Sequence, residues 1–217
     1  MTTPHRILAA LAAALLAGEA RAAEPPCEHC HPKKEGAAAS APAGGADARV
    51  DLADVTLLDQ HGASVPLRAL AAGDPLVVMD FVFTTCTTVC PVLSAIMARL
   101  QKRLGDRVGK DVLLVSVSID PVRDTPGRLE AYAARFKAGP GWTWLTGTRE
   151  DVDRALEGMG AYAASFADHA PMILVGDGRA GTWTRFNGFP KQDEVLAQLD
   201  ALAAARAKVA RAAPVKE

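Results

Sequence analysis

The chain has 217 residues, with 24 Lys and Arg against 25 Asp and Glu and a formal net charge of −1. This balance excludes nucleic acid as the main partner, because phosphate binding needs a concentrated excess of basic side chains. Hydrophobic residues make up 49% of the chain and charged residues 23%, which are the proportions of a globular protein rather than a disordered one.

The first 22 residues are predicted to be a secretory signal peptide. His5 and Arg6 precede an apolar stretch over residues 7–17, which is followed by the small-residue site Ala20-Arg21-Ala22. The stretch has about half the length that a membrane-spanning helix needs. We therefore expect an exported, periplasmic protein, attached to the inner membrane if the signal is not cleaved, that works in an oxidising compartment.

Residues 23–49 are predicted to be a flexible linker, because Ala, Gly and Pro dominate them and no apolar period is visible. The linker contains Cys27-Glu28-His29-Cys30-His31, the C-x-x-C-H pattern of covalent haem attachment. No helical pattern follows that could wrap a haem. Metal capture or thiol exchange by a mobile tail, an incidental disulfide and an exposed haem therefore all remain open.

The folded unit is predicted over residues 50–205, followed by a C-terminal tail over 206–217. Its pattern alternates strands and helices and indicates an α/β sandwich with one central sheet flanked by helices. In chain order we expect a hairpin over 55–59 and 64–67, a buried strand over 76–83, a helix over 89–104, a buried strand over 112–119, a helix opened by Thr125 and Pro126, a helix opened by Thr148, late strands over 171–175 and 184–186, and a final helix carrying Val195, Leu199 and Leu202.

Cys86 and Cys90 lie where the first buried strand meets its helix, the position at which open α/β folds place their sites. If both are helical, their Cβ atoms lie about 5–6 Å apart. That spacing suits two thiolates on one soft metal ion, Cu(I) or zinc, and with a small adjustment it suits a disulfide. The free N–H groups of the helix start are expected to lower the pKa of these thiols. A structural disulfide or two buried free thiols are the alternatives.

Two motifs, Thr85-Cys86-Thr87-Thr88-Val89-Cys90-Pro91 and Ser118-Ile119-Asp120-Pro121, resemble those of the Sco/SenC family of copper chaperones. Asp124-Thr125-Pro126, Trp144-Leu145-Thr146-Gly147 and Asp168-His169 extend the likeness, which covers about residues 54–202. The resemblance implies a thioredoxin-like fold with a mixed sheet and an N-terminal hairpin. It also implies copper held by Cys86, Cys90 and His169, and a role in assembling the dinuclear copper centre of cytochrome c oxidase.

One departure concerns the residues after the first cysteine, where many members of that family have Pro-Asp and this chain has Thr87-Thr88. The implied ligands are present in spite of this change, whereas the acidic side chain that many members carry beside them is absent. For His169, the alternative to a copper ligand is an ordinary surface histidine. For Asp168, a solvated loop carboxylate competes with a role in orienting the His169 ring.

Two functions follow from a thiolate pair. The first is a copper-binding assembly factor, without enzymatic turnover, whose partners are the copper-accepting subunit of cytochrome c oxidase and a thiol reductant. The second is a thiol–disulfide oxidoreductase that acts through a redox disulfide of Cys86 and Cys90. The C-x-x-x-C spacing is one residue longer than the usual C-x-x-C of thioredoxin-like reductants, which favours the first function.

Deletion of residues 24–36 is expected to leave the melting temperature of the protein nearly unchanged, because this segment contributes no residues to the predicted core. Thermal unfolding of the full and shortened proteins, monitored by circular dichroism, checks this expectation. A large fall in melting temperature would show instead that the segment packs on the domain.

Overall fold

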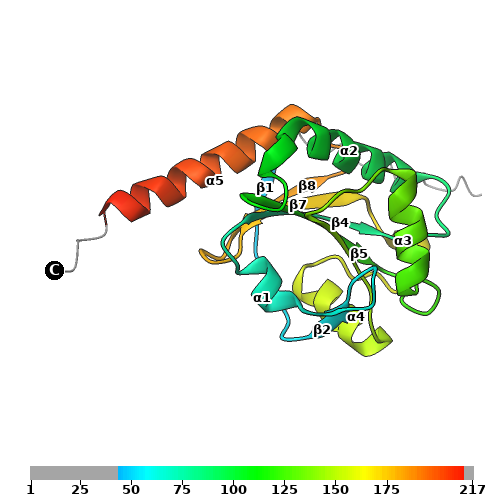
Figure 1. The fold of residues 1–217 in the computed structure, drawn as a ribbon. Helices are drawn as coiled ribbons and strands as arrows, with labels where there is room; N and C mark the ends of the chain where they lie inside the picture. Colours follow the sequence, from blue (N-terminus) through cyan, green and yellow to red (C-terminus); the bar gives the residue numbers. More distant parts are fainter. Residues whose placement is uncertain (1–43, 213–217) are drawn as a thin grey trace, which may run out of the picture. The chain divides into compact units, whose positions relative to one another are not determined.

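The computed structural model describes residues 44–212 and contains a six-stranded mixed sheet in the order β1-β8-β7-β4-β5-β6 (Figure 1). Strands β4, β5 and β6 run parallel, whereas β7 is antiparallel to β4, β8 to β7 and β1 to β8. The strands span Ala46–Ala48 (β1), Leu76–Val82 (β4), Val112–Ser118 (β5), Trp142–Leu145 (β6), Met172–Asp177 (β7) and Thr182–Asn187 (β8). The predicted N-terminal hairpin is present as β2 (Thr56–Leu58) and β3 (Ser64–Pro66).

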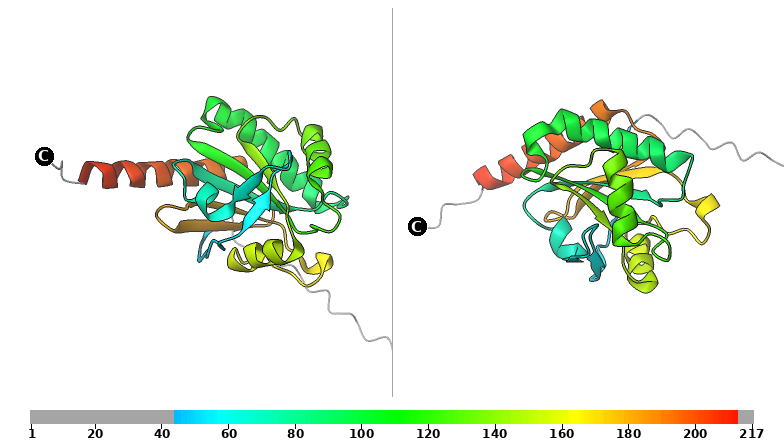
Figure 2. Two further views of the ribbon diagram at one scale, coloured as in Figure 1. Left: turned by 60° about the horizontal axis from the view of Figure 1, so that its bottom comes forward. Right: turned by 45° about the vertical axis from the view of Figure 1, so that its right-hand side comes forward.

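Helices cover both faces of the sheet, as the sequence predicts (Figure 2). The helices are α1 (Leu67–Ala71), α2 (Val89–Leu104), α3 (Pro126–Arg135), α4 (Arg149–Gly158) and α5 (Gln192–Ala212), with 3₁₀ turns η1 (Gly105–Arg107) and η2 (Phe166–Asp168). Helices α2, α3 and α5 pack on one face, here called the α2 face. Helices α1 and α4 and strand β2 pack on the other, the α4 face. Among residues 44–212, no helix combines the length and apolar character needed to cross a membrane.

Strand β4 is central because it is apolar on both sides and completely buried. Side chains alternate along a strand, so Val78 and Val82 pack on the α2 face whereas Val77, Met79 and Phe81 pack on the α4 face. A strand buried on both faces reads as a continuous apolar run, which is how the sequence predicts it. The chain leaves this strand at the cysteine loop, so the loop starts from a rigid support.

The structure differs from the sequence prediction at the ends of the domain and at two local features. Strand β1 lies inside the segment predicted as linker, and α5 continues to Ala212, inside the predicted tail. Strand β6 was not predicted. Thr125 occupies the N-cap of α3, yet its side chain makes no capping hydrogen bond, whereas Thr148 at the start of α4 accepts one from the Asp151 N–H.

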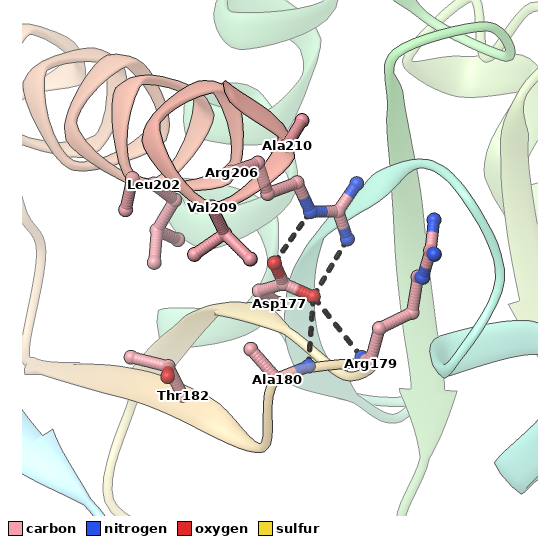
Figure 3. Close-up of a pocket in the computed structure, with 9 residues that line it drawn as sticks. Asp177, Arg179, Ala180, Thr182, Leu202, Arg206, Val209 and Ala210 are labelled. Carbon is pink, nitrogen blue, oxygen red and sulfur yellow. Dashed lines mark hydrogen bonds and ion pairs between the residues drawn. The ribbon is translucent and has the colours of Figure 1, made fainter. Parts of the chain in front are cut away.

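Helix α5 is held at the β7–β8 turn by an ion pair between the half-buried Arg206 and the buried Asp177 (Figure 3). The same carboxylate accepts the backbone N–H groups of Arg179 and Ala180 at 3.0 and 3.1 Å. The Arg206 hydrogen bond lowers the pKa of Asp177 below its ordinary value. A cavity of about 630 Å³ lies beside this pair, mainly against apolar atoms of α5 such as those of Leu202 and Val209. The ion pair therefore has a structural role, and neither cysteine lines the cavity beside it.

Asp80 is a fully buried carboxyl in the middle of β4. Its Oδ1 accepts the Ser116 hydroxyl at 2.5 Å, and the Ser116 oxygen in turn accepts the Trp142 indole N–H at 2.9 Å, while Asp80 Oδ2 has no hydrogen-bond partner. Burial raises the pKa of Asp80 to about 7, more than the Ser116 hydrogen bond lowers it. An ionised Asp80 therefore costs the folded protein free energy.

Replacing Asp80 by Asn is expected to stabilise the protein at pH 8 and to have little effect near pH 4. The folded pKa of about 7 exceeds the unfolded value of about 3.9, so the native protein binds the extra proton between these limits and loses stability as the pH rises through this window. Above it, Asp80→Asn removes a penalty of about 2–4 kcal/mol. Urea unfolding at pH 4 and pH 8 measures the difference.

The matched control is Asp177→Asn, for which the opposite sign is expected. The pKa of Asp177 is lowered, so its carboxylate stabilises the fold above the unfolded pKa, and this stabilisation is lost as the pH falls through the folded pKa. The Asp177 variant should therefore be less stable than the parent protein at pH 8. A less stable Asp80→Asn variant at pH 8 would contradict the assignment of Asp80 as a buried, penalised carboxyl.

Candidate metal and thiol site

The two cysteines lie in the connection between β4 and α2, as the sequence predicts. Cys86 precedes the helix, and its backbone N–H donates to the Phe83 carbonyl at 3.1 Å. Cys90 lies in the first turn of α2 and donates its backbone N–H to the Cys86 Sγ at 3.3 Å. Only Cys90 is therefore helical, whereas Cys86 folds back over the start of the helix and receives one of its free N–H groups.

The two thiols are free and have different environments. Only 8% of Cys86 and 1% of Cys90 is exposed. Burial raises the pKa of Cys86, but hydrogen bonds from Cys90 and Thr88 outweigh burial and leave the pKa below its ordinary value. The pKa of Cys90 is raised, first by burial and then by its hydrogen bond with Cys86. The expectation of two thiols with lowered pKa thus holds for Cys86 and is wrong for Cys90.

Asp124 fixes the first half of the cysteine loop and was not singled out for this role from the sequence. Its carboxylate accepts the Thr84 backbone N–H at 3.2 Å, the Thr84 hydroxyl at 2.6 Å and the Ser118 hydroxyl at 2.7 Å. Asp124 is 1% exposed. The buried carboxylate therefore ties the loop after β5 to the loop that carries Cys86, and its three donors offset the cost of burying a charge.

His169 follows η2, in the loop that leads into β7. This loop lies beside the cysteine loop, because β7 pairs with β4 and the Phe166 ring stacks on Phe83 at a centroid distance of 5.0 Å. The His169 ring itself contacts Phe81, with centroids 6.3 Å apart, and lines a cavity of about 300 Å³ with Ile119 and Leu156. These contacts place it toward the α4 face.

The structure therefore brings Cys86 and Cys90 together and leaves His169 in the neighbouring loop, apart from them. Within residues 44–212, no three His, Cys, Asp or Glu side chains are grouped closely enough to hold a metal ion. His169 is 8% exposed and its Nε2 has no hydrogen-bond partner. Burial lowers the pKa of His169, so the ring is a neutral base with an available nitrogen. Asp168 is exposed. The Cys27-Cys30-His31 motif lies outside the described residues.

The domain matches the SCO1/SenC family model over residues 48–204. Protein SenC of Rhodobacter capsulatus is 31% identical over 134 residues, which cover 58% of this chain and 58% of that protein. The chain covers less than two thirds of the length of the curated relatives that it matches.

Solved structures agree with this match. BsSco, described as a member of the Sco family of cytochrome c oxidase assembly proteins with a disulfide switch, superposes with a TM-score of 0.61 at 25% identity, covering 73% of this chain and 96% of that one. ScoI of Bradyrhizobium japonicum, solved with copper bound, has a TM-score of 0.57 at 23% identity, covering 74% of this chain and 99% of that one. With a thioredoxin-like fold and a family match over most of its length, this chain belongs to the SCO1/SenC family.

Proposed function

We propose that this protein binds copper as cargo on Cys86, Cys90 and His169 and delivers it during assembly of the dinuclear copper centre of cytochrome c oxidase. The observation that carries the proposal is the thiol pair, two sulfur ligands held in one turn between β4 and α2, with the Cys90 N–H on the Cys86 sulfur at 3.3 Å. Two thiolates suit Cu(I), and an imidazole adds a ligand that suits Cu(II). Three protein ligands leave a coordination position open for exchange.

Family membership supports this function. BsSco is described as belonging to cytochrome c oxidase assembly proteins, and ScoI of Bradyrhizobium japonicum holds copper. The proposed partners are the copper-accepting subunit of the oxidase and a thiol reductant, which keeps the pair able to load because a disulfide cannot bind copper. Export to the periplasm, predicted from the N-terminal residues, belongs to the same proposal.

His169 reaches the sulfurs in this proposal by a change in the short segment before β7. In the pairing of β4 with β7, Asp80 lies opposite Ile173, and Ile173 packs on the α2 face with both cysteines. Extending β7 backwards would bring His169 level with Thr84 and, by alternation, onto that same face. The backbone turns at η2 instead. Straightening this turn would therefore move His169 away from Phe81 and toward the sulfurs of Cys86 and Cys90.

A second candidate function, thiol–disulfide exchange, is favoured by the unequal pKa values of the two thiols. Cys86, with the lowered pKa, would attack a partner disulfide as a thiolate, forming a mixed disulfide and releasing one partner thiolate. Cys90 would then lose its proton, attack the Cys86 sulfur and release the second partner thiol. The partner gains two electrons, this protein is left with a Cys86–Cys90 disulfide, and an external thiol reductant restores the pair.

Replacing His169 by Ala is expected to weaken Cu(II) binding about 100-fold and Cu(I) binding less than about threefold, because two thiolates still hold the softer ion. The matched control is His61→Ala, which removes an exposed histidine from the β2–β3 turn. Anaerobic titration of the reduced protein, followed by absorption and electron paramagnetic resonance, measures both affinities. Cu(II) binding by the His169 variant that equals that of the control would remove His169 from the site.

Alkylation of the metal-free, reduced protein is expected to modify Cys86 at least about ten times faster than Cys90 at pH 7. Cys86 has the lower pKa and the larger exposure, and the thiolate is the reactive form. Iodoacetamide labelling of the single-cysteine variants Cys90→Ser and Cys86→Ser, quantified by mass spectrometry, gives the two rates. Equal rates would exclude the ordered two-step exchange described above.

A further inference from the structure

Four exposed apolar side chains lie on the loops and in the first turns of α2, at the sheet end that carries the cysteines. They are Val92 (46% exposed), Val122 (70%), Phe166 (40%) and Phe189 (47%), and together they are called the apolar rim. Val92 follows Cys90 in the first turns of α2, and Phe166 precedes His169. Large apolar residues are normally buried when the fold allows it, so several around one opening indicate a surface that a partner covers.

Contacts between the loops hold the rim residues at one end of the sheet. The Val122 loop is tied to the cysteine loop through Asp124 and Thr84, whose side chains are 2.6 Å apart. Phe166 is stacked on Phe83, at the start of the cysteine loop. Phe189 follows Gly188, whose N–H donates at 2.7 Å to the carbonyl of Pro171, just after the His169 segment. The loops of Val122, Phe166 and Phe189 are thus each connected to the cysteine loop or to the His169 segment, and Val92 follows Cys90 in the chain.

The cysteine loop inside the rim carries no acidic or basic side chain. The segment Thr84–Val92 contains no Asp, Glu, Lys or Arg, and its exposed members include Thr85, Thr87 and Thr88. The exposed charges that flank the rim have both signs: Arg123, which is paired with the buried Asp120 at 3.0 Å, Lys191 and Asp168. A partner that fits this surface therefore offers apolar and hydroxyl groups rather than a charged patch, and its binding depends little on ionic strength.

The burial of the sulfurs determines what kind of partner this is. Copper passes between proteins by ligand exchange, in which acceptor atoms must come within about 2–2.3 Å of the ion. Cys86 and Cys90 are 8% and 1% exposed, so an acceptor reaches them only by seating a loop in the opening and covering the rim. We propose that the apolar rim is the docking surface for the copper-accepting protein, which presents an uncharged apolar surface around its own thiolate ligands. This inference rests on the proposed function.

The transfer itself involves no change of oxidation state. Bonds from Cu(I) to the sulfurs of Cys86 and Cys90 break as bonds to acceptor thiolates form. The protons that the acceptor thiols release return to the sulfurs of this protein. Apolar contacts at the rim exclude water from this exchange and hold the two ligand sets in register, so the rim affects the rate of transfer rather than the affinity for copper.

The test compares Val122→Asp and Phe189→Asp with Val209→Asp. Val209 is 72% exposed on the part of α5 that projects from the opposite end of the domain, so it is a control for a new charge on an exposed valine (Figure 1). Each protein is loaded with Cu(I) and mixed anaerobically with the reduced, copper-free soluble domain of the oxidase's copper-accepting subunit. Rapid mixing gives the rate of transfer, and competition with a Cu(I) chelator gives the affinity.

We expect both rim variants to bind Cu(I) within about twofold of the parent protein and to transfer it at least about tenfold more slowly, while Val209→Asp matches the parent. The parent rate should change less than about twofold between 50 and 500 mM salt. Parent-like transfer by both rim variants, or a parent rate that falls steeply with salt, would contradict the docking role of the rim. Neither result would contradict the proposed delivery function. Failure of the copper-loaded parent protein to load the acceptor overturns the proposed delivery function as well.

Discussion

The hydrogen bond from the Cys90 N–H to the Cys86 sulfur organises the site. It uses a donor that the start of a helix leaves without an intrahelical partner, and it directs that donor at a sulfur atom. The result is a thiol pair whose members are close in space but unequal in proton affinity. The same N–H group favours negative charge on Cys86, while burial disfavours it on Cys90. The proposed disulfide exchange starts from this inequality.

The loop depends on elements that are distant in the sequence. Strand β4 supplies a rigid start, and Asp124, from the loop after β5, holds Thr84 through both its backbone and its hydroxyl group. The Phe83–Phe166 stack joins the His169 segment to the same point. Three loops are thus assembled around one opening by a buried carboxylate and an aromatic pair. The cavity beside Asp177 and Arg206 is lined by neither cysteine, and the ion pair there anchors α5.

Local sequence patterns predict the parts of the fold that follow local rules. The continuous apolar run of β4 and the helical spacing of α2 gave both elements and placed the cysteines between them. Strand β1 escaped prediction because Ala46–Ala48 has no apolar alternation and is ordered by pairing with β8. The conformation of Cys86 and the anchoring by Asp124 depend on long-range contacts that no spacing encodes. The side of the sheet that His169 occupies depends on the turn at η2, which sequence alternation alone does not reveal.

The position of η2 connects the proposed third copper ligand to the proposed docking surface. Phe166 begins η2 and His169 directly follows it, so a rearrangement that straightens this turn to bring the imidazole to the sulfurs also displaces an exposed aromatic ring. In the proposed site, a cuprous ion needs only the two sulfurs, whereas a cupric ion recruits the third ligand. The exposed surface around Phe166 would then differ between the Cu(I)-loaded and the Cu(II)-loaded protein. An acceptor would distinguish the two loaded forms before any bond to copper is exchanged.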